Sequence, residues 1–229
     1  MSTIAENLAA VRDRIARAAL AASRSPEEIT LVAVSKTKPA SAIREAYAAG
    51  QRDFGENYAQ ELASKAEELT DLEGLRFHYI GHLQTNKAKV VARHAHVVHT
   101  VDSVALAKEL GKRALKEGWG DVRGRMPVLV EVNVGGEVQK HGATAVEIGP
   151  VLEALAAERA LEVRGLMTMP PHDLEAARRA FEALRSLRNL HGGRARLPHL
   201  SMGMSDDLEV AIASGSTIVR VGSAIFGSR

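Results

Sequence analysis

The sequence of 229 residues contains no cysteine. This absence excludes disulfide bonds, thiolate metal sites, iron–sulfur clusters and cysteine nucleophiles, and it is consistent with a reducing compartment. No stretch approaches about 18 consecutive apolar residues, and charged residues interrupt residues 1–20, where a signal peptide would need its apolar segment. We therefore expect a cytoplasmic protein that does not contact a membrane.

The sequence also lacks a strong excess of charge, low-complexity tracts and linker-like segments. Its 30 Lys and Arg residues and 28 Asp and Glu residues give a net charge of +2, which is too even to predict nucleic-acid binding. Apolar residues make up 45% of the chain and charged residues 25%, ordinary values for a globular protein. We expect one domain over residues 1–229, with a sizeable core.

The apolar pattern predicts an initial helix and then alternating strands and helices. Ile4, Leu8, Val11 and Ile15 form a stripe at helical spacing, so the chain should begin with an amphipathic helix. β-branched runs predict strands at 29–36, 52–57, 76–82, 97–103, 127–134, 162–169, 199–204 and 216–222. Helical stretches separate nearly all of them, at 39–49, 57–69, 84–93, 103–117, 144–158, 173–190 and 205–214.

Helical crossovers between successive strands are typical of parallel pairing. The number of these units in a chain of this length favours a (β/α)₈ barrel with an extra N-terminal helix. The alternative, a doubly wound open sheet, more usually has about five or six strands.

Polar residues close several of the predicted strands, at the end where barrels of this kind carry their working residues. Strand alternation gives Lys36 the parity of Val32, and it gives Arg220 the parity of Ile218, so both cations can point into the barrel. Burying two cations near one mouth is costly unless an anion or an imine partner satisfies them. We therefore predict a phosphorylated ligand.

The segments after the seventh and eighth strands are the expected place for a phosphate. Gly203, Gly222 and Gly227 permit close backbone approach, and Ser201 and Ser223 offer hydroxyl groups. Ser205, followed by Asp206 and Asp207, predicts a helix N-cap whose acids disfavour an anion at that helix start. We therefore expect the phosphate against Ser201 and the Gly222–Ser223 turn.

A lysine and a phosphate site together indicate pyridoxal 5′-phosphate, which combines an aldehyde with a phosphate. Lys36 is the candidate imine-forming residue, since burial and the neighbouring Lys38 can lower its pKa. Arg220 can face the ring nitrogen and keep it unprotonated, which weakens the ring as an electron sink. The alternatives are a solvent-exposed Lys36, an ion pair between Arg220 and Glu131, and a phosphosugar or phosphate-ester enzyme without aldehyde chemistry.

Two further groups of residues predict no separate site. His94, His96 and His99 match no metal-binding spacing, and no cysteine supports them, so we expect no metal. The arginines of residues 178–190 recur on a predicted helix and indicate a solvated face.

The chain resembles the YggS/PROSC-like family of pyridoxal phosphate homeostasis proteins almost from end to end. The resemblance rests on VAVSKTKP (32–39), FGENYAQE (54–61), HYIGHLQTNK (78–87), VNVGGEVQKHG (132–142), RGLMTM (164–169), LSMGMSDDLEVAIASGST (200–217) and VRVGSAIFG (219–227). It implies an alanine racemase-type barrel that carries pyridoxal phosphate on Lys36, keeps the free cofactor low and supplies it to other enzymes.

The resemblance also implies roles for individual residues. It puts the phosphate on Ser201, Gly222 and Ser223, the ring nitrogen near Arg220, and Asn57 beside the cofactor. Many family members have Thr where this chain has Ser223, which keeps the hydroxyl. Lys140 is a second lysine that the family pattern puts near the mouth, as an exchange partner for Lys36 or as a simple loop lysine.

Carrier and racemase remain the two readings of such a site. Racemisation needs acid–base groups on opposite faces of the substrate carbon, and alanine racemases supply a tyrosine from a second domain across a dimer. The tyrosines here are Tyr47, Tyr58 and Tyr79, and none is predicted at a strand end. We therefore expect a monomeric carrier that releases the cofactor to apoenzymes without robust catalysis, with a small single-domain racemase as the alternative.

Overall fold

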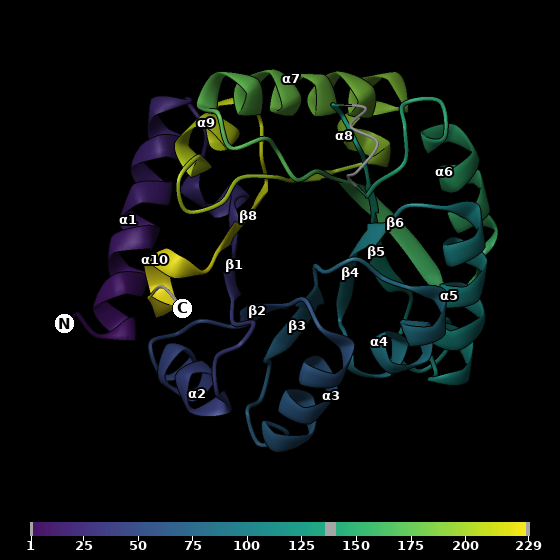
Figure 1. The fold of residues 1–229 in the computed structure, drawn as a ribbon, viewed down its shortest axis with the longest axis horizontal. Helices are drawn as coiled ribbons and strands as arrows, with labels where there is room; N and C mark the ends of the chain where they lie inside the picture. The colour runs from purple at the N-terminus through teal and green to yellow at the C-terminus, as the bar shows by residue number, and fades with distance from the viewer. Residues whose placement is uncertain (1, 136–140, 228–229) are drawn as a thin grey trace.

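The computed structural model describes residues 2–135 and 141–227. Its parallel strands close into a barrel in the order of the sequence, and the helices surround it (Figure 1). The strands are β1 (Thr30–Val34), β2 (Asp53–Glu56), β3 (Arg76–Tyr79), β4 (Val97–Val101), β5 (Met126–Glu131), β6 (Leu161–Met167), β7 (His199–Ser201) and β8 (Ile218–Val221). The predicted (β/α)₈ barrel is confirmed.

Helices follow the strands around the outside of the barrel. They are α1 (Ile4–Ala21), α2 (Ala40–Ala48), α3 (Ala59–Glu68), α4 (Ala88–His94), α5 (Val104–Lys116), α6 (Ile148–Ala157), α7 (Leu174–Leu190), α8 (Gly193–Arg196), α9 (Leu208–Ala213) and α10 (Ser223–Phe226). Two 3₁₀ turns, η1 (Pro26–Glu28) and η2 (Thr85–Lys87), precede β1 and α4. Within the described residues, no helix combines the length and apolar character needed to cross a membrane.

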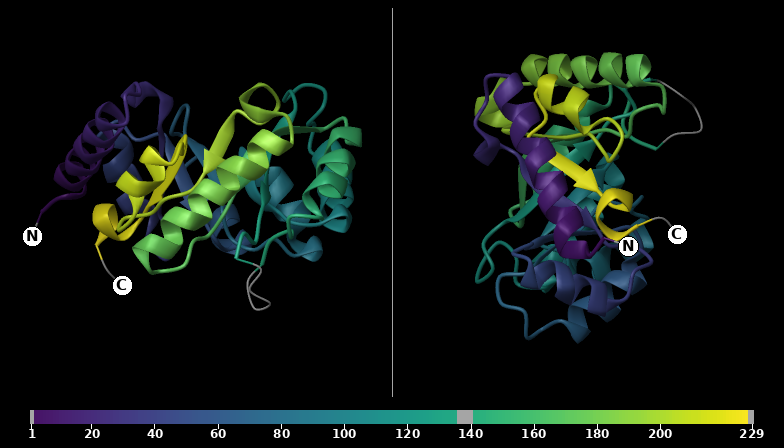
Figure 2. Two further views of the ribbon diagram at one scale, coloured as in Figure 1. Left: turned by 90° about the horizontal axis from the view of Figure 1, so that it is seen from above. Right: turned by 90° about the vertical axis from the view of Figure 1, so that its left-hand side faces the viewer.

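The predicted extra helix is α1, which packs along α9 and α10 (Figure 2). Thr3 and Glu6 form a capping box at its start, and Leu8, Val11 and Ile15 are buried as the stripe predicted. Asn7 Nδ2 donates to the carbonyl of Ile225 over 2.9 Å, which ties the start of the chain to α10. The helix therefore covers the seam where β8 meets β1.

Two hydrophobic clusters occupy the two sides of the strands. The larger lies between the strands and the helices. The smaller lies inside the barrel and contains only strand residues: Val32, Leu129, Met167 and Ile218. The sequence analysis gave Lys36 the parity of Val32 and Arg220 the parity of Ile218. Because Val32 and Ile218 do face the barrel interior, their positions agree with the inward direction predicted for the two cations.

One difference from the sequence prediction that bears on the site lies after β7. The predicted helix 205–214 begins only at Leu208, and Asp207, not Ser205, occupies its N-cap position. Asp207 Oδ1 accepts a hydrogen bond from the Met204 amide over 2.6 Å, which holds residues 204–207 as a turn. The prediction of Ser205 as the helix cap was therefore wrong, and its hydroxyl is available for another contact.

Candidate functional site

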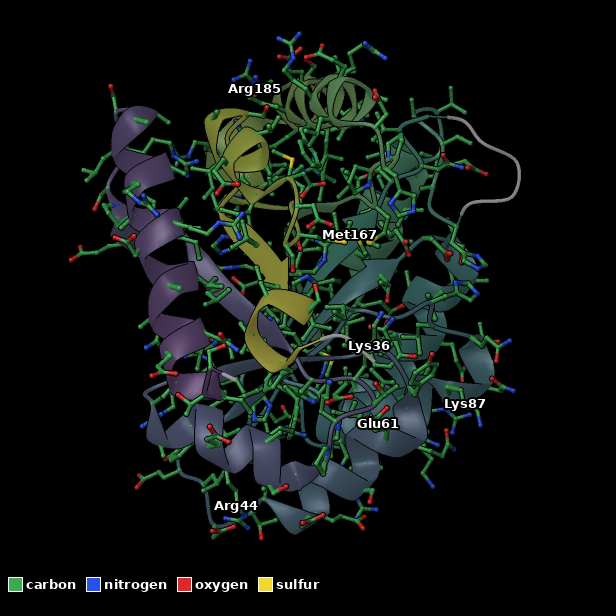
Figure 3. The ribbon with its side chains drawn as sticks, turned by 60° about the vertical axis from the view of Figure 1, so that its left-hand side comes forward. Lys36, Arg44, Glu61, Lys87, Met167 and Arg185 are labelled. Atoms are coloured by element: carbon green, nitrogen blue, oxygen red, sulfur yellow. The ribbon has the colours of Figure 1, made fainter. Side chains whose placement is uncertain are left out.

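The carboxyl ends of β1, β2 and β8 border a cavity of about 370 Å³ at the barrel mouth. Its wall contains five of the predicted site residues: Lys36, Asn57, Arg220, Gly222 and Ser223. Figure 3 shows Lys36 toward the middle of the molecule, whereas Arg44, Lys87 and Arg185 lie at its outer edge. Segments far apart in the sequence thus converge on one cavity.

The loop that carries Lys36 is held from behind by an ionic cluster between β2 and α3. Lys65 Nζ donates to the carbonyl of Ser35 over 2.7 Å and contacts carboxylate oxygens of Glu56 and Glu61. Ser35 Oγ donates to Glu56, and the Thr37 amide donates to Glu61 over 2.6 Å. The residues on both sides of Lys36 are therefore anchored.

This cluster is buried, and the sequence analysis missed it. Burial raises the pKa of Glu56, while the Lys65 ammonium opposes that rise. Thr37 adopts φ +64°, in the left-handed region that L-residues rarely occupy. A strained residue next to Lys36 persists because the surrounding contacts hold it, and such strain is typical of functional loops.

Arg220 lies almost fully buried beneath the cavity. Its Nη1 donates to Ser201 Oγ over 2.7 Å, and its Nη2 donates to the carbonyl of Thr168 and lies 3.1 Å from Met169 Sδ. Burial lowers the pKa of Arg220 to about 10, so it remains a cation at neutral pH. The alternative ion pair with Glu131 is absent from the bridges within 4.0 Å that the described residues form.

Ser201 does not line the cavity, in contrast to the expectation for a phosphate ligand. It is fully buried, and its Oγ lies between Arg220 and His99, with His99 Nδ1 at 2.9 Å. Ser201 is the last residue of β7. Ser201 therefore sits below the mouth, behind Arg220.

A line of hydrogen bonds continues from Ser201 through the barrel interior. His99 Nε2 lies 2.9 Å from His78 Nδ1, and His78 Nε2 lies 2.8 Å from Asp53 Oδ1. Asp53 also accepts two hydrogen bonds from the guanidinium group of the exposed Arg76, one from Nε and one from Nη2. Burial opposes ionisation of Asp53, but hydrogen bonds from His78 and Arg76 hold its pKa well below the usual range. Burial lowers the pKa of His99 well below its usual value.

The hydroxyl that partners Ser223 belongs to Ser205. Ser223 Oγ donates to Ser205 Oγ over 3.1 Å, and both residues line the cavity. Gly222 lies against β1, where an added Cβ would come within 3.2 Å of the Val34 carbonyl. Gly203 has φ +97°, and a Cβ there would collide with Ala211. Gly222 therefore lets the end of β8 approach β1, and Gly203 lets the segment after β7 pack against α9.

Asn57 adds an unsatisfied polar atom to the same cavity. Its Oδ1 is buried and has no hydrogen-bond partner. Gly81 packs against the Asn57 backbone, where an added Cβ would lie 2.1 Å from the Asn57 carbonyl oxygen. A buried acceptor without a partner beside a lysine fits a ligand with a donor group at that point.

A second cavity of about 630 Å³ adjoins the first, and the two share the walls Met169, His172 and Met204. Glu131 lies in it at 6% exposure, and its Oε2 has no hydrogen-bond partner. Burial, reinforced by the Asp102 charge, raises the pKa of Glu131 to about 7. The sequence analysis considered Glu131 only as a partner for Arg220.

The tyrosines lie away from the cavity. Tyr79 is the last residue of β3, so the prediction that no tyrosine ends a strand was wrong. Its side chain belongs to the cluster between strands and helices, and its hydroxyl donates to the His82 carbonyl over 3.3 Å. Among the described residues around the 370 Å³ cavity, none is a tyrosine.

The histidines singled out from the sequence have other partners. His96 Nδ1 accepts from the Phe77 amide, and His99 belongs to the interior line of hydrogen bonds. A different group, His82, Asp102 and His141, brings ligand atoms within 4.8 Å of one another. The rings of His82 and His141 stack at 3.6 Å with 9° between their planes, so their lone pairs run parallel instead of converging on one point. We assign no metal there.

Comparison with known proteins gives the class first. The family model for the alanine racemase N-terminal domain matches residues 6–229. Alanine racemase from Corynebacterium glutamicum superposes with a TM-score of 0.68 at 22% identity, over 99% of this chain and 61% of that one, which shows a shared fold. The chain is an α/β barrel of the alanine racemase N-terminal type.

Closer relatives define the family within that class. The pyridoxal phosphate homeostasis protein of Escherichia coli K12 is 47% identical over 100% of this chain and 98% of its own length, and that of Pseudomonas aeruginosa is 47% identical over 100% and 97%. PipY of Synechococcus elongatus PCC7942, solved without PLP, has a TM-score of 0.85 at 39% identity over 98% of this chain and 100% of that one. The chain belongs to the family of pyridoxal phosphate homeostasis proteins, as the motifs indicated.

Proposed function

We propose that this protein binds pyridoxal 5′-phosphate at the barrel mouth through Lys36 and serves its homeostasis by releasing it to apoenzymes, without robust catalysis. The observation that carries the proposal is a single cavity with a lysine, a buried arginine and a pair of serine hydroxyls in its wall. The same cofactor is bound in a solved structure of PipY, which is 39% identical and superposes with a TM-score of 0.82.

The donor set fits the chemistry of the cofactor. When bound, pyridoxal 5′-phosphate supplies an aldehyde that forms an imine with a primary amine, and an aromatic ring that can withdraw electrons. In this proposal Lys36 provides the amine, and Ser205, Ser223 and the Gly222 backbone would hold the phosphate. Asn57 Oδ1, which has no partner in the protein, would accept a hydrogen bond from the cofactor. Ser201 supports Arg220 and does not touch the phosphate.

Arg220 accounts for the lack of robust turnover in this proposal. A guanidinium with a pKa of about 10 stays charged at neutral pH and cannot accept a proton from the ring nitrogen. The ring therefore stays neutral and stabilises a carbanion poorly. The absence of a tyrosine from the described cavity wall also removes the usual second acid–base group.

The proposal also covers the domain organisation, the oligomeric state and the location of the protein. We infer that the barrel acts as a single domain and as a monomer in the cytoplasm. The large apolar side chains exposed on the described surface lie in several helices and loops and support the monomer: Leu20, Tyr58, Val122, Val146, Met169, Leu174 and Leu190. Lys140, expected from the resemblance near the mouth, lies outside the described residues.

Reduction and peptide mapping test the proposal. The purified protein is mixed with pyridoxal 5′-phosphate, its visible spectrum is recorded, borohydride is added, and the added mass is located. We expect one adduct on Lys36, which is lost in Lys36→Ala and retained in the control Lys89→Ala, on the exposed side of α4. An adduct at another lysine, or none together with phosphosugar binding, overturns the proposal. Steady alanine racemisation that depends on Lys36 overturns its non-catalytic part.

A further inference from the structure

The 630 Å³ cavity beside the proposed cofactor site has the features of a binding site for a second ligand. Its walls are mostly apolar, with Val132, Met169, Pro170, Pro171, Ala180 and Met204 among them. Its volume lies within the range of small-molecule sites, and such sites combine an apolar lining with a few polar groups that fix orientation.

The polar residues in its wall are Glu131, Asn133, His141, Thr168, His172 and Arg179, and of these only Glu131 carries a carboxylate. Glu131 ends β5 and points to the barrel interior with Leu129, so it lines the cavity from inside. Glu131 is only 6% exposed, and its Oε2 has no hydrogen-bond partner. A buried carboxylate oxygen without a donor is unfavourable, and a cationic donor inside the cavity would remove that penalty.

We propose that this cavity binds a primary ammonium group on an apolar body, with the Glu131 carboxylate as its counterion. The ammonium supplies donors for the unpartnered Oε2, and the apolar body covers the Val132 and Pro170 walls. The site does not include Lys36, so it exists in the cofactor-free protein. Because both cavities share Met169 and Met204, a bound amine would lie next to the proposed cofactor.

Charges around Glu131 determine how binding depends on pH. Asp102, after β4, favours protonation of Glu131, and Arg220, on β8, opposes it. His141, His172 and, on α7, Arg179 also line the cavity. An alkylamine stays protonated between pH 6 and pH 8, whereas Glu131 with a pKa of about 7 ionises across that range. Amine affinity should therefore rise several-fold from pH 6 to pH 8.

The test uses cofactor-free protein labelled with ¹³C at the methionine methyl groups. Hexylamine is the probe, and 1-hexanol and hexanoate are controls with the same apolar body and different heads. We expect hexylamine to shift the signals of Met169 and Met204 but not that of Met126, which lies at the start of β5. Hexanol and hexanoate should bind at least about tenfold more weakly at pH 8.

The matched variants are Glu131→Gln and Glu175→Gln, which exchange a buried and an exposed carboxylate for amides. Glu131→Gln should lower the affinity for hexylamine by about tenfold or more and remove most of the pH dependence of that affinity. Glu175→Gln should change neither. Equal binding of hexylamine and hexanol, or unchanged binding in Glu131→Gln, overturns the proposal. Should Glu131→Gln fail to fold, Ala180→Phe, which fills the cavity, must abolish the shifts in its place.

Failure here is distinguishable from failure of the proposed function. Borohydride trapping on Lys36 and hexylamine binding are measured separately on the wild-type protein. Trapping without amine binding overturns only the ammonium site, and amine binding without trapping overturns only the cofactor proposal.

Discussion

Arg220 Nη1 donates to Ser201 Oγ over 2.7 Å, and this contact fixes the protons of the groups beyond it. A hydroxyl that accepts from Arg220 has its own hydrogen left to donate to His99 Nδ1. His99 then carries its proton on Nε2 and donates to His78, which in turn donates from Nε2 to Asp53. In this assignment, which follows from the hydrogen-bond network, each histidine accepts one hydrogen bond and donates one.

Replacing Ser201 tests its place behind Arg220. Ser201→Ala leaves Arg220 and His99 each without one partner inside the barrel, so the free energy of unfolding should fall by about 1–3 kcal/mol. Because Ser201 does not reach the cavity, the preference for pyridoxal phosphate over pyridoxal should stay unchanged. Urea denaturation and parallel titrations with the two ligands measure both quantities. A selective loss of the phosphate preference would restore Ser201 as a phosphate ligand.

In contrast to Ser201, we expect Ser205 and Ser223 to determine the preference for pyridoxal phosphate over pyridoxal. Ser205→Ala and Ser223→Ala should each weaken the binding of pyridoxal phosphate by about 1.5–3 kcal/mol, the contribution of a hydrogen bond to a charged group. Pyridoxal, which lacks the phosphate, should bind both variants almost as well as the wild type. Ser186→Ala, on the exposed face of α7, is the control. If only Ser223→Ala discriminates between the ligands, Ser205 has no part in the phosphate site.

Substitution of Arg220 separates retention of the cofactor from its attachment. Arg220→Ala should weaken retention during dialysis, while Lys36 can still be trapped with borohydride after excess cofactor is added. The reason is that the guanidinium lies beneath the cavity, whereas the lysine that would attach the cofactor lies in the loop after β1. Circular dichroism checks the fold of this buried variant. Retention equal to that of the wild type would remove Arg220 from the site.

The sequence predicted the inward direction of Lys36 and Arg220 because alternation along a strand is a local rule. It did not predict that Ser205 lines the cavity, because the pattern suggested a helix beginning at that residue. The hydrogen bond from the Met204 amide to Asp207 holds a turn there instead, and α9 begins only at Leu208. It also missed the Glu56–Lys65 pair, since nothing in the spacing tells which charged residues a strand and its helix bury together. Element boundaries and long-range polar pairs are set by tertiary packing.

Removal of Lys65 tests the support behind Lys36. Lys65→Met leaves the Glu56 carboxylate buried without its cation, so the free energy of unfolding should fall by about 3–5 kcal/mol. The Ser35 carbonyl loses its donor as well, and the rate of borohydride-trappable attachment to Lys36 should fall. The double variant Lys65→Met, Glu56→Gln should recover much of the stability but not the rate. Lys89→Met, on the exposed side of α4, should match the wild type in both.

The raised pKa of Glu131 predicts a pH dependence of stability with a definite sign. Between pH 4.5 and about 7 the folded protein keeps a proton on Glu131 that the unfolded chain has released. The free energy of unfolding therefore falls as pH rises through this window, by about 1.4 kcal/mol per unit at most and about 3 kcal/mol in total, and does not fall further above it. Glu131→Gln has no such proton, so its stability relative to the wild type should rise across the window and then stay level. Urea denaturation of both cofactor-free proteins at a series of pH values measures the difference, and parallel curves would show that Glu131 ionises normally despite its burial.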